Sequence, residues 1–208
     1  MTLEPIDLPL RCRCGRVRGL ARDVAPSTGF RFVCYCRDCQ AFARFLARPD
    51  VLDAAGGTDL FQMAAGRVTL AAGADAVRCL RFSSKVLRWY AACCRTALAN
   101  TAAGPRFPVV AVIHSFMDHA ADGRSRDAVL GPPVCRIYER SATAPLPPDA
   151  PAPPAFRLFA LRASRLLGWW WYGHGRPNPF FDARTQAPLA APRLLAPAER
   201  AALLDGTE

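Results

Sequence analysis

Closely spaced cysteines are the residues of this sequence with the clearest chemistry. They fall into three clusters, which read Cys12-Arg13-Cys14-Gly15, Cys34-Tyr35-Cys36-Arg37-Asp38-Cys39 and Cys93-Cys94. Sulfurs from one short turn can converge on a single ion, and zinc binds thiolates at about 2.3 Å. Gly15 lets the chain turn sharply after the first pair, so that both thiolates can face the same way. The pattern predicts thiolate-bound metal, with zinc as the expected ion.

The number of clustered cysteines indicates two metal sites rather than one, because zinc takes four ligands. Cys34, Cys36 and Cys39 supply three sulfurs and leave a fourth position for water or substrate. Such an open position is typical of catalytic zinc. The same triple could instead recruit a fourth thiolate or a histidine and only hold the fold, and the spacing alone leaves both interpretations open. We therefore expect one or two zinc ions per chain.

The N-terminal sequence favours a reducing compartment. The segment MTLEPIDLPL contains Glu4 and Asp7 and lacks the basic and apolar regions of a signal peptide. No uncharged apolar run approaches the roughly 20 residues that cross a bilayer. We expect a cytoplasmic protein whose thiols stay reduced, and the odd count of nine cysteines disfavours a complete disulfide set.

The formal net charge of +10 could attract nucleic acid, an anionic membrane surface or an anionic small substrate. Many solvated arginines are the simpler interpretation. The sequence contains no recognisable nucleic-acid-binding module, so no specific nucleic acid is expected as a partner.

Short strands are the elements that must position the cysteines. Between residue 11 and about residue 140, apolar stretches alternate with Gly and polar turns, which predicts a mainly β domain over residues 1–143. The expected strands are Val17–Leu20, Phe30–Cys34, Val68–Leu70, Val77–Phe82 and Val109–His114. A short helix is expected over residues 38–46, directly after the second cluster, with Phe42 and Phe45 on one side.

The C-terminal part has a different composition. Residues 144–155 contain six prolines and predict an extended linker. Residues 156–208 are expected to form a helical extension, with an amphipathic helix over 156–172 and a last helix over 197–205 that Gly206 ends. One face of the first helix is apolar, with Phe156, Phe159, Ala163, Leu166, Leu167 and Trp170. The opposite face carries Arg157, Arg162 and Arg165.

Two interpretations of the apolar face and of Trp169–Tyr172 stay open. The face could pack the extension onto the β domain or onto a second subunit of a homo-oligomer. Alternatively, residues 156–172 could make peripheral membrane contact, because tryptophan favours the headgroup region and arginine favours anionic lipid.

The ordered cysteine motifs resemble a known family. The motif CxCG is followed by CYCRDCQAF, GGTDLFQ and LRFSSKVLRWYAACCRTAL. This series, over roughly residues 10–140, resembles the glutathione-dependent formaldehyde-activating enzymes, which are carbon–sulfur lyases, and related zinc domains such as that of centromere protein V.

The resemblance implies a zinc-bound β-tent fold of small antiparallel sheets and two kinds of zinc site. Cys12, Cys14 and Cys94, with Cys93, would hold structural zinc. Cys34, Cys36 and Cys39 would hold catalytic zinc, which acts on a small-molecule thiol such as glutathione and on formaldehyde. The anionic tripeptide could be bound through its carboxylates by a nearby arginine, and the candidates are Arg37, Arg44 and Arg88.

One departure from the family concerns the structural site. The family motif FCxxCGT reads here as Tyr90-Ala91-Ala92-Cys93-Cys94-Arg95-Thr96. Cys94 occupies the second cysteine position, whereas Ala91 occupies the first and Arg95 replaces the glycine. Either Cys93 becomes the fourth ligand or the site is altered. The change indicates a divergent branch, so glutathione and formaldehyde are not fixed as substrates.

Four further residues have chemistry that the motifs do not use. Cys79 and Cys135 lie in apolar contexts and are expected to be buried as small hydrophobic residues. His114 or His119 could complete the open zinc site or act as a general base, although an isolated histidine is more often structural.

The sequence therefore predicts a zinc-dependent carbon–sulfur lyase-like enzyme. A non-catalytic, zinc-stabilised binding module with a basic and aromatic surface is the main alternative. A membrane-associated protein acting through residues 156–172 is the third.

Overall fold

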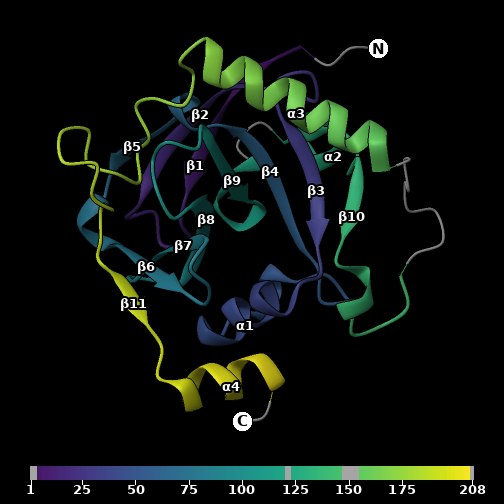
Figure 1. Ribbon diagram of the computed structural model, residues 1–208, viewed down its shortest axis with the longest axis vertical. Helices are drawn as coiled ribbons and strands as arrows, with labels where there is room; N and C mark the ends of the chain where they lie inside the picture. The colour runs from purple at the N-terminus through teal and green to yellow at the C-terminus, as the bar shows by residue number, and fades with distance from the viewer. Residues whose placement is uncertain (1–3, 120–122, 147–154, 207–208) are drawn as a thin grey trace.

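The strands form two sheets in the part of the chain that the computed structural model describes, residues 4–119, 123–146 and 155–206 (Figure 1). The smaller sheet is antiparallel, with the order β1 (Ile6–Arg11), β2 (Arg18–Val24) and β5 (Val68–Ala72). The larger sheet has the order β10-β3-β4-β9-β8-β7-β6-β11. Its strands are β3 (Phe30–Cys34), β4 (Thr58–Ala64), β6 (Val77–Arg81), β7 (Val86–Ala91), β8 (Thr96–Ala102), β9 (Val109–Ile113), β10 (Cys135–Ile137) and β11 (Pro192–Leu194). The prediction of a mainly β fold with a C-terminal helical extension is confirmed.

The larger sheet is antiparallel at its centre and parallel at its two edges, where β10 pairs with β3 and β11 pairs with β6. All five residues of β3 and of β9 are buried. A strand that is covered on both faces is mostly apolar along its whole length, which is why the sequence indicated both strands. The run is continuous in β9, and in β3 it is interrupted by the buried Arg31. The predicted strand at residues 30–34 has the predicted bounds, and the other four apolar stretches each become a strand with slightly shifted ends.

Two apolar clusters form most of the core. The larger one joins residues of both sheets and includes the fully buried Trp89 and the buried Phe116 of the single turn His114–Phe116. The smaller cluster lies against helix α1 (Arg37–Phe45), which follows the second cysteine motif as predicted. Phe42 and Phe45 of α1 both meet Tyr90 edge to face, with ring centroids 6.3 and 5.6 Å apart. This contact fixes α1 over the sheet.

The C-terminal segment completes both the sheet and the core. Strand β11 forms the edge beside β6, and Phe180 stacks on Trp89 with ring centroids 5.0 Å apart. Both rings are fully buried. Helix α4 (Pro197–Asp205) has the predicted bounds and lies against α1 at the end of the molecule opposite α3 (Ala155–Trp171) (Figure 1). Residues 147–154 of the predicted proline-rich linker lie outside the described residues.

Helix α3 is present as predicted, and the predicted packing onto the β domain is seen for Trp169 and Leu166, whereas the rest of the apolar face is largely exposed. Phe156, Phe159 and Leu167 are 70%, 75% and 65% exposed. The inner face consists of the buried Trp169, the partly buried Leu161 and Leu166, and two arginines. Long arginine stems pack well on apolar surface while their charged ends find polar partners, so they can serve as an inner face. Packing of the outer face onto a second subunit stays a prediction.

A spanning helix needs about 20 mainly apolar residues. Within the described residues, the structure contains no helix with the length and apolar character needed to cross a membrane.

Candidate metal centres

Four cysteine sulfurs meet between two hairpin turns. Cys12 and Cys14 follow β1, and Cys93 and Cys94 lie in the turn from β7 to β8. The Sγ–Sγ distances are 3.3 Å for Cys14–Cys93, 3.6 Å for Cys12–Cys14 and 3.9 Å for both Cys12–Cys93 and Cys93–Cys94. Four thiolates placed tetrahedrally at about 2.3 Å from zinc are about 3.8 Å apart, whereas a disulfide measures about 2.05 Å. The spacing fits a metal ion, and all nine cysteines are free thiols.

The backbone at Arg95 explains how two adjacent cysteines share this cluster. Arg95 has a φ of 56°, in the left-handed region that favours glycine. It closes a four-residue turn between the paired residues Ala91 and Thr96. Ala91 itself is buried within β7. Cys93 therefore lies where a fourth sulfur is needed, which is the first of the two outcomes that the sequence left open.

Hydrogen bonds to the sulfurs of this cluster stabilise a negatively charged thiolate. The backbone amide of Val17 donates to the Cys12 sulfur at 3.2 Å, and the Cys94 sulfur lies 3.1 Å from the Thr96 hydroxyl. Burial acts to raise the pKa of Cys94, but the hydrogen bonds from Thr96 and Cys14 outweigh it and lower that pKa to about 6. Burial and the neighbouring thiols raise the pKa of Cys93. At least one sulfur is thus favoured as thiolate, the form that binds metal.

Three further sulfurs meet at the start of α1. Cys34 ends β3, Cys36 caps α1 and Cys39 lies in its first turn, and the three sulfurs are within 4.8 Å of one another. Cys34 and Cys39 are buried, whereas Cys36 is half-buried. Hydrogen bonds from the thiols of Cys34 and Cys36, together with the positive charge of Arg88, hold the pKa of Cys39 well below its usual value. The helix N-terminus also favours a thiolate.

Arg88 is the buried cation beside this triple. Its side chain comes from β7 and is 4% exposed, with Nη1 3.5 Å from the Cys39 sulfur and Nη2 3.8 Å from an Asp38 carboxylate oxygen. The guanidinium also lies 5.8 Å from the ring centres of Phe42 and Phe82. A buried cation requires an anionic partner. Zinc on three thiolates carries one negative charge, so the donor set and Arg88 together suit a zinc ion.

The other two arginine candidates are already engaged by α4. Arg37 forms an ion pair with Asp205 at 2.6 Å, and Arg44 donates to the backbone carbonyl oxygen of Leu203 at 2.6 Å.

The remaining single candidates lie outside both clusters. Cys79 and Cys135 are buried as predicted, and burial raises the pKa of Cys79 to about 12. His114 and His119 belong to neither group of converging ligand atoms. The hypothesis that one of them completes a cysteine site therefore gains no geometric support.

A buried charge network near these histidines was not visible in the sequence. Asp59 of β4 accepts hydrogen bonds from Arg31 at 2.7 Å and from Arg126 at 2.8 Å, and Arg126 begins helix α2 (Arg126–Leu130). Burial acts to raise the pKa of Asp59, but the two arginines outweigh it and lower that pKa. The residues of this charge network are far apart in the chain. Only the GGTDLFQ motif, which contains Asp59, could have drawn attention to one of them.

A family model described as a family of unknown function (DUF6151) matches residues 6–190. The chain belongs to this DUF6151 family. The matched span contains all seven clustered cysteines. It also includes α3 and Phe180, so the match to the DUF6151 family is not limited to the β-rich part of the chain. No curated protein matches the chain.

Proposed function

We propose that this protein is a zinc-dependent carbon–sulfur lyase-like enzyme that acts on the adduct of a small-molecule thiol and a small aldehyde. The observation that carries the proposal is the inequality of the two cysteine clusters, four sulfurs in one and three sulfurs beside the buried Arg88 in the other. Four protein ligands are typical of structural zinc, whereas three leave a position for substrate.

The chain's own residues have distinct roles in this proposal. Cys34, Cys36 and Cys39 hold the reactive ion, and Cys12, Cys14, Cys93 and Cys94 hold the structural one. Zinc, when bound, supplies Lewis acidity toward a carbonyl and stabilises a thiolate. Arg88 keeps positive charge at the Cys39 sulfur, and the half-buried side of Cys36 gives access from solvent.

The resemblance of the ordered cysteine motifs to glutathione-dependent formaldehyde-activating enzymes supports glutathione and formaldehyde as the first substrates to test. The competing proposal is a zinc-stabilised binding module without catalysis. It is favoured by the deep burial of Cys34 and Cys39, at 5% and 4% exposure.

Metal content tests the assignment of the two cysteine clusters. Wild-type protein should hold about two equivalents of zinc, and Cys36→Ser and Cys93→Ser should each retain about one. Cys135→Ala is the matched control, because Cys135 is buried but outside both clusters, and it should retain both ions.

Exchange spectroscopy by NMR tests the chemistry. Zinc-loaded wild type should accelerate exchange between glutathione, formaldehyde and their adduct, and folded Cys36→Ser should not. If Cys36→Ser unfolds the chain, the triple is structural and the binding module is favoured. An absence of acceleration by wild type that holds both ions, with glutathione or another cellular thiol, would sink the enzyme proposal.

A further inference from the structure

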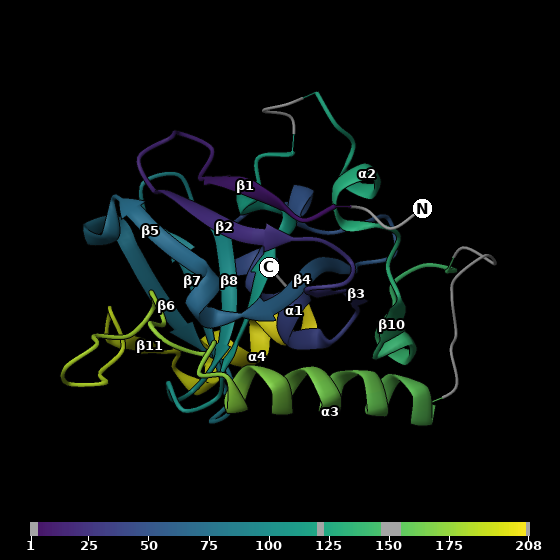
Figure 2. The same ribbon diagram turned by 90° about the horizontal axis from the view of Figure 1, so that it is seen from above.

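Helix α3 presents an apolar stripe to the outside of the molecule. Phe159, Leu167, Trp170 and Trp171 are 75%, 65%, 67% and 80% exposed. At 3.6 residues per turn, these side chains cover about one third of the helix circumference. Figure 2 shows α3 along the rim of the molecule, with one long side turned away from the sheets. No described residue outside α3 packs over this stripe in the apolar clusters.

The opposite side of α3 is firmly attached. Trp169 is 7% exposed and packs in a cluster with Ala64 and Val109. The Arg165 guanidinium donates to the Pro26 carbonyl oxygen at 2.8 Å, and the Arg162 guanidinium lies 5.7 Å from the centre of the Phe30 ring. The exposed stripe therefore belongs to a docked helix, and it can meet a partner only side-on.

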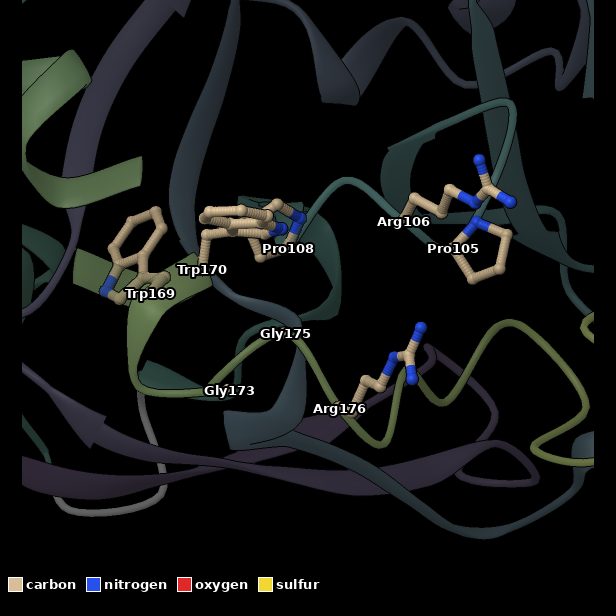
Figure 3. Close-up of a pocket in the computed structure, with 8 residues that line it drawn as sticks. All are labelled: Pro105, Arg106, Pro108, Trp169, Trp170, Gly173, Gly175 and Arg176. Atoms are coloured by element: carbon tan, nitrogen blue, oxygen red, sulfur yellow. The ribbon is translucent and has the colours of Figure 1, made fainter. Parts of the chain in front are cut away.

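A cavity of about 380 Å³ adjoins the C-terminal end of the stripe. Trp169, Trp170 and Pro108 line one side of it, and Arg106 and Arg176 line the other (Figure 3). No hydrogen bond or ion pair joins either of these guanidinium groups to another described residue, and both arginines are exposed. Arginine binds phosphate oxygens in a bidentate manner.

Two further exposed aromatic side chains adjoin the residues of this surface in the sequence. Tyr172, next to Trp171, is 71% exposed, and Phe107, next to Arg106, is 46% exposed. Tryptophan and tyrosine favour the headgroup region of a bilayer, where one part of the ring is apolar and another is polar. An apolar face flanked by tryptophan or tyrosine and by arginines is typical of helices that lie in the plane of a membrane surface.

We propose that the outer side of α3 and the cavity between Arg106 and Arg176 form a binding surface for an anionic lipid membrane. The stripe enters the boundary between headgroups and acyl chains, with α3 parallel to the membrane plane. Arg106 and Arg176 bind headgroup phosphate. The net charge of +10 adds long-range attraction to anionic lipid.

Charge favours a membrane over a second copy of the chain. Helix α3 contains no aspartate or glutamate. Two copies packed helix to helix would therefore bring no carboxylate from α3 to Arg106 and Arg176, and each copy carries the same positive net charge. An anionic bilayer supplies both the apolar phase and the phosphate groups.

Vesicle co-sedimentation tests the proposal with the full chain, using phosphatidylcholine vesicles with and without phosphatidylserine. Wild type should bind the anionic vesicles more strongly. Combining Phe159→Ser with Trp171→Ser should lower the partition coefficient on the order of tenfold or more on both kinds of vesicle, because buried apolar area is lost. Combining Arg106→Gln with Arg176→Gln should lower it by about tenfold on the anionic vesicles and by less on the pure phosphatidylcholine vesicles, whose phosphate charge is balanced by choline.

Leu194→Ser is the matched control, because Leu194 is 70% exposed but lies in β11, and it should bind like wild type. Zinc-free and zinc-loaded wild type that are both folded should bind alike, so the outcome is independent of the proposed enzyme. Failure of wild type to sediment with anionic vesicles would overturn the proposal. So would unchanged binding by the Phe159 and Trp171 variant, or a dimer in ultracentrifugation that this variant abolishes.

Discussion

Arg95 is a small feature on which the four-sulfur cluster depends. Its positive φ turns the chain so that Cys93 and Cys94, although adjacent, both point toward Cys12 and Cys14. A residue without branching at Cβ tolerates this conformation with moderate strain, glycine adopts it without strain, and a β-branched residue resists it.

The first prediction concerns this strain. Arg95→Val should lower the free energy of unfolding by about 1–3 kcal/mol and weaken zinc retention at the four-sulfur cluster, because the backbone must leave the left-handed region. Arg95→Gly, at the same position, should retain both the stability and the zinc. Urea unfolding and zinc competition with a chelator measure the two effects. Equal behaviour of the two variants would mean that φ at residue 95 does not control the cluster.

A second prediction concerns pH and the half-buried His119. Burial, reinforced by the charges of Arg126 and Arg31 and opposed by that of Asp59, lowers the pKa of His119 to about 4. Both ring nitrogens are buried without a hydrogen-bond partner in the described structure. The unfolded chain, with a histidine pKa of about 6.5, binds this proton more readily than the folded chain.

Stability should therefore fall as the pH is lowered from about 6.5 to about 4, within the window set by these two pKa values. His119→Leu should show a smaller fall over this window, whereas the exposed His174→Gln should follow wild type. Urea unfolding at a series of pH values gives the comparison. If His119→Leu loses stability in parallel with wild type, another group is responsible.

The position of a helix in the sequence does not tell which of its faces is inside. The periodicity of α3 separates apolar residues from arginines, and this separation predicted the helix. It did not predict that Arg162 and Arg165 would face the sheet, because their partners, the Phe30 ring and the Pro26 carbonyl, come from distant residues. By contrast, β3, β9 and α4 were predictable, since mostly apolar runs and the Pro197 and Gly206 end signals are local, although nothing local indicated that Arg31 of β3 would be buried.

A third prediction tests the orientation of α3. Trp169→Ala should lower the free energy of unfolding by about 3–5 kcal/mol, because the ring is buried against Ala64 and Val109. Trp170→Ala, one residue further on, should change it by less than about 0.5 kcal/mol, because that side chain is 67% exposed. Thermal or urea unfolding of the two variants decides the matter. A reversed order would mean that the apolar stripe faces inward.

The candidate sites were also predictable only in part. The cysteine spacing indicated both clusters, since ligands within a turn are close whatever the fold. Arg88 was one of three arginine candidates, and only the pairing of β7 in the sheet places it beside Cys39. The network around Asp59 joins three distant segments, so no local pattern announces it.

At the scale of the whole molecule, the chain cannot be divided at its proline-rich segment without a loss. Phe180 covers Trp89 in the core, and β11 pairs with β6 along the edge of the larger sheet. Residues beyond 155 thus supply part of the core to residues before 143. The domain boundary at residue 143, which was inferred from composition, remains a prediction. Whether residues 1–143 fold without the rest of the chain can be measured.

The fourth prediction is that a chain shortened to residues 1–143 loses cooperative unfolding, because Trp89 loses its stacking partner and β6 becomes an exposed edge. A chain shortened to residues 1–195 keeps Phe180 and β11 and should unfold cooperatively. Urea unfolding followed by tryptophan fluorescence compares the two. Cooperative unfolding of the shorter chain would make residues 1–143 an independent domain.

The contact between α1 and α4 also bears on when the cysteines of the triple become covered during synthesis. Leu203 and Leu204 of α4 pack against the apolar cluster that contains Cys34 and Cys39, and Asp205 holds Arg37. Synthesis proceeds from the N-terminus, so the three cysteines leave the ribosome long before these last residues. On the proposed function, a metal ion could therefore reach the three sulfurs before α4 covers them.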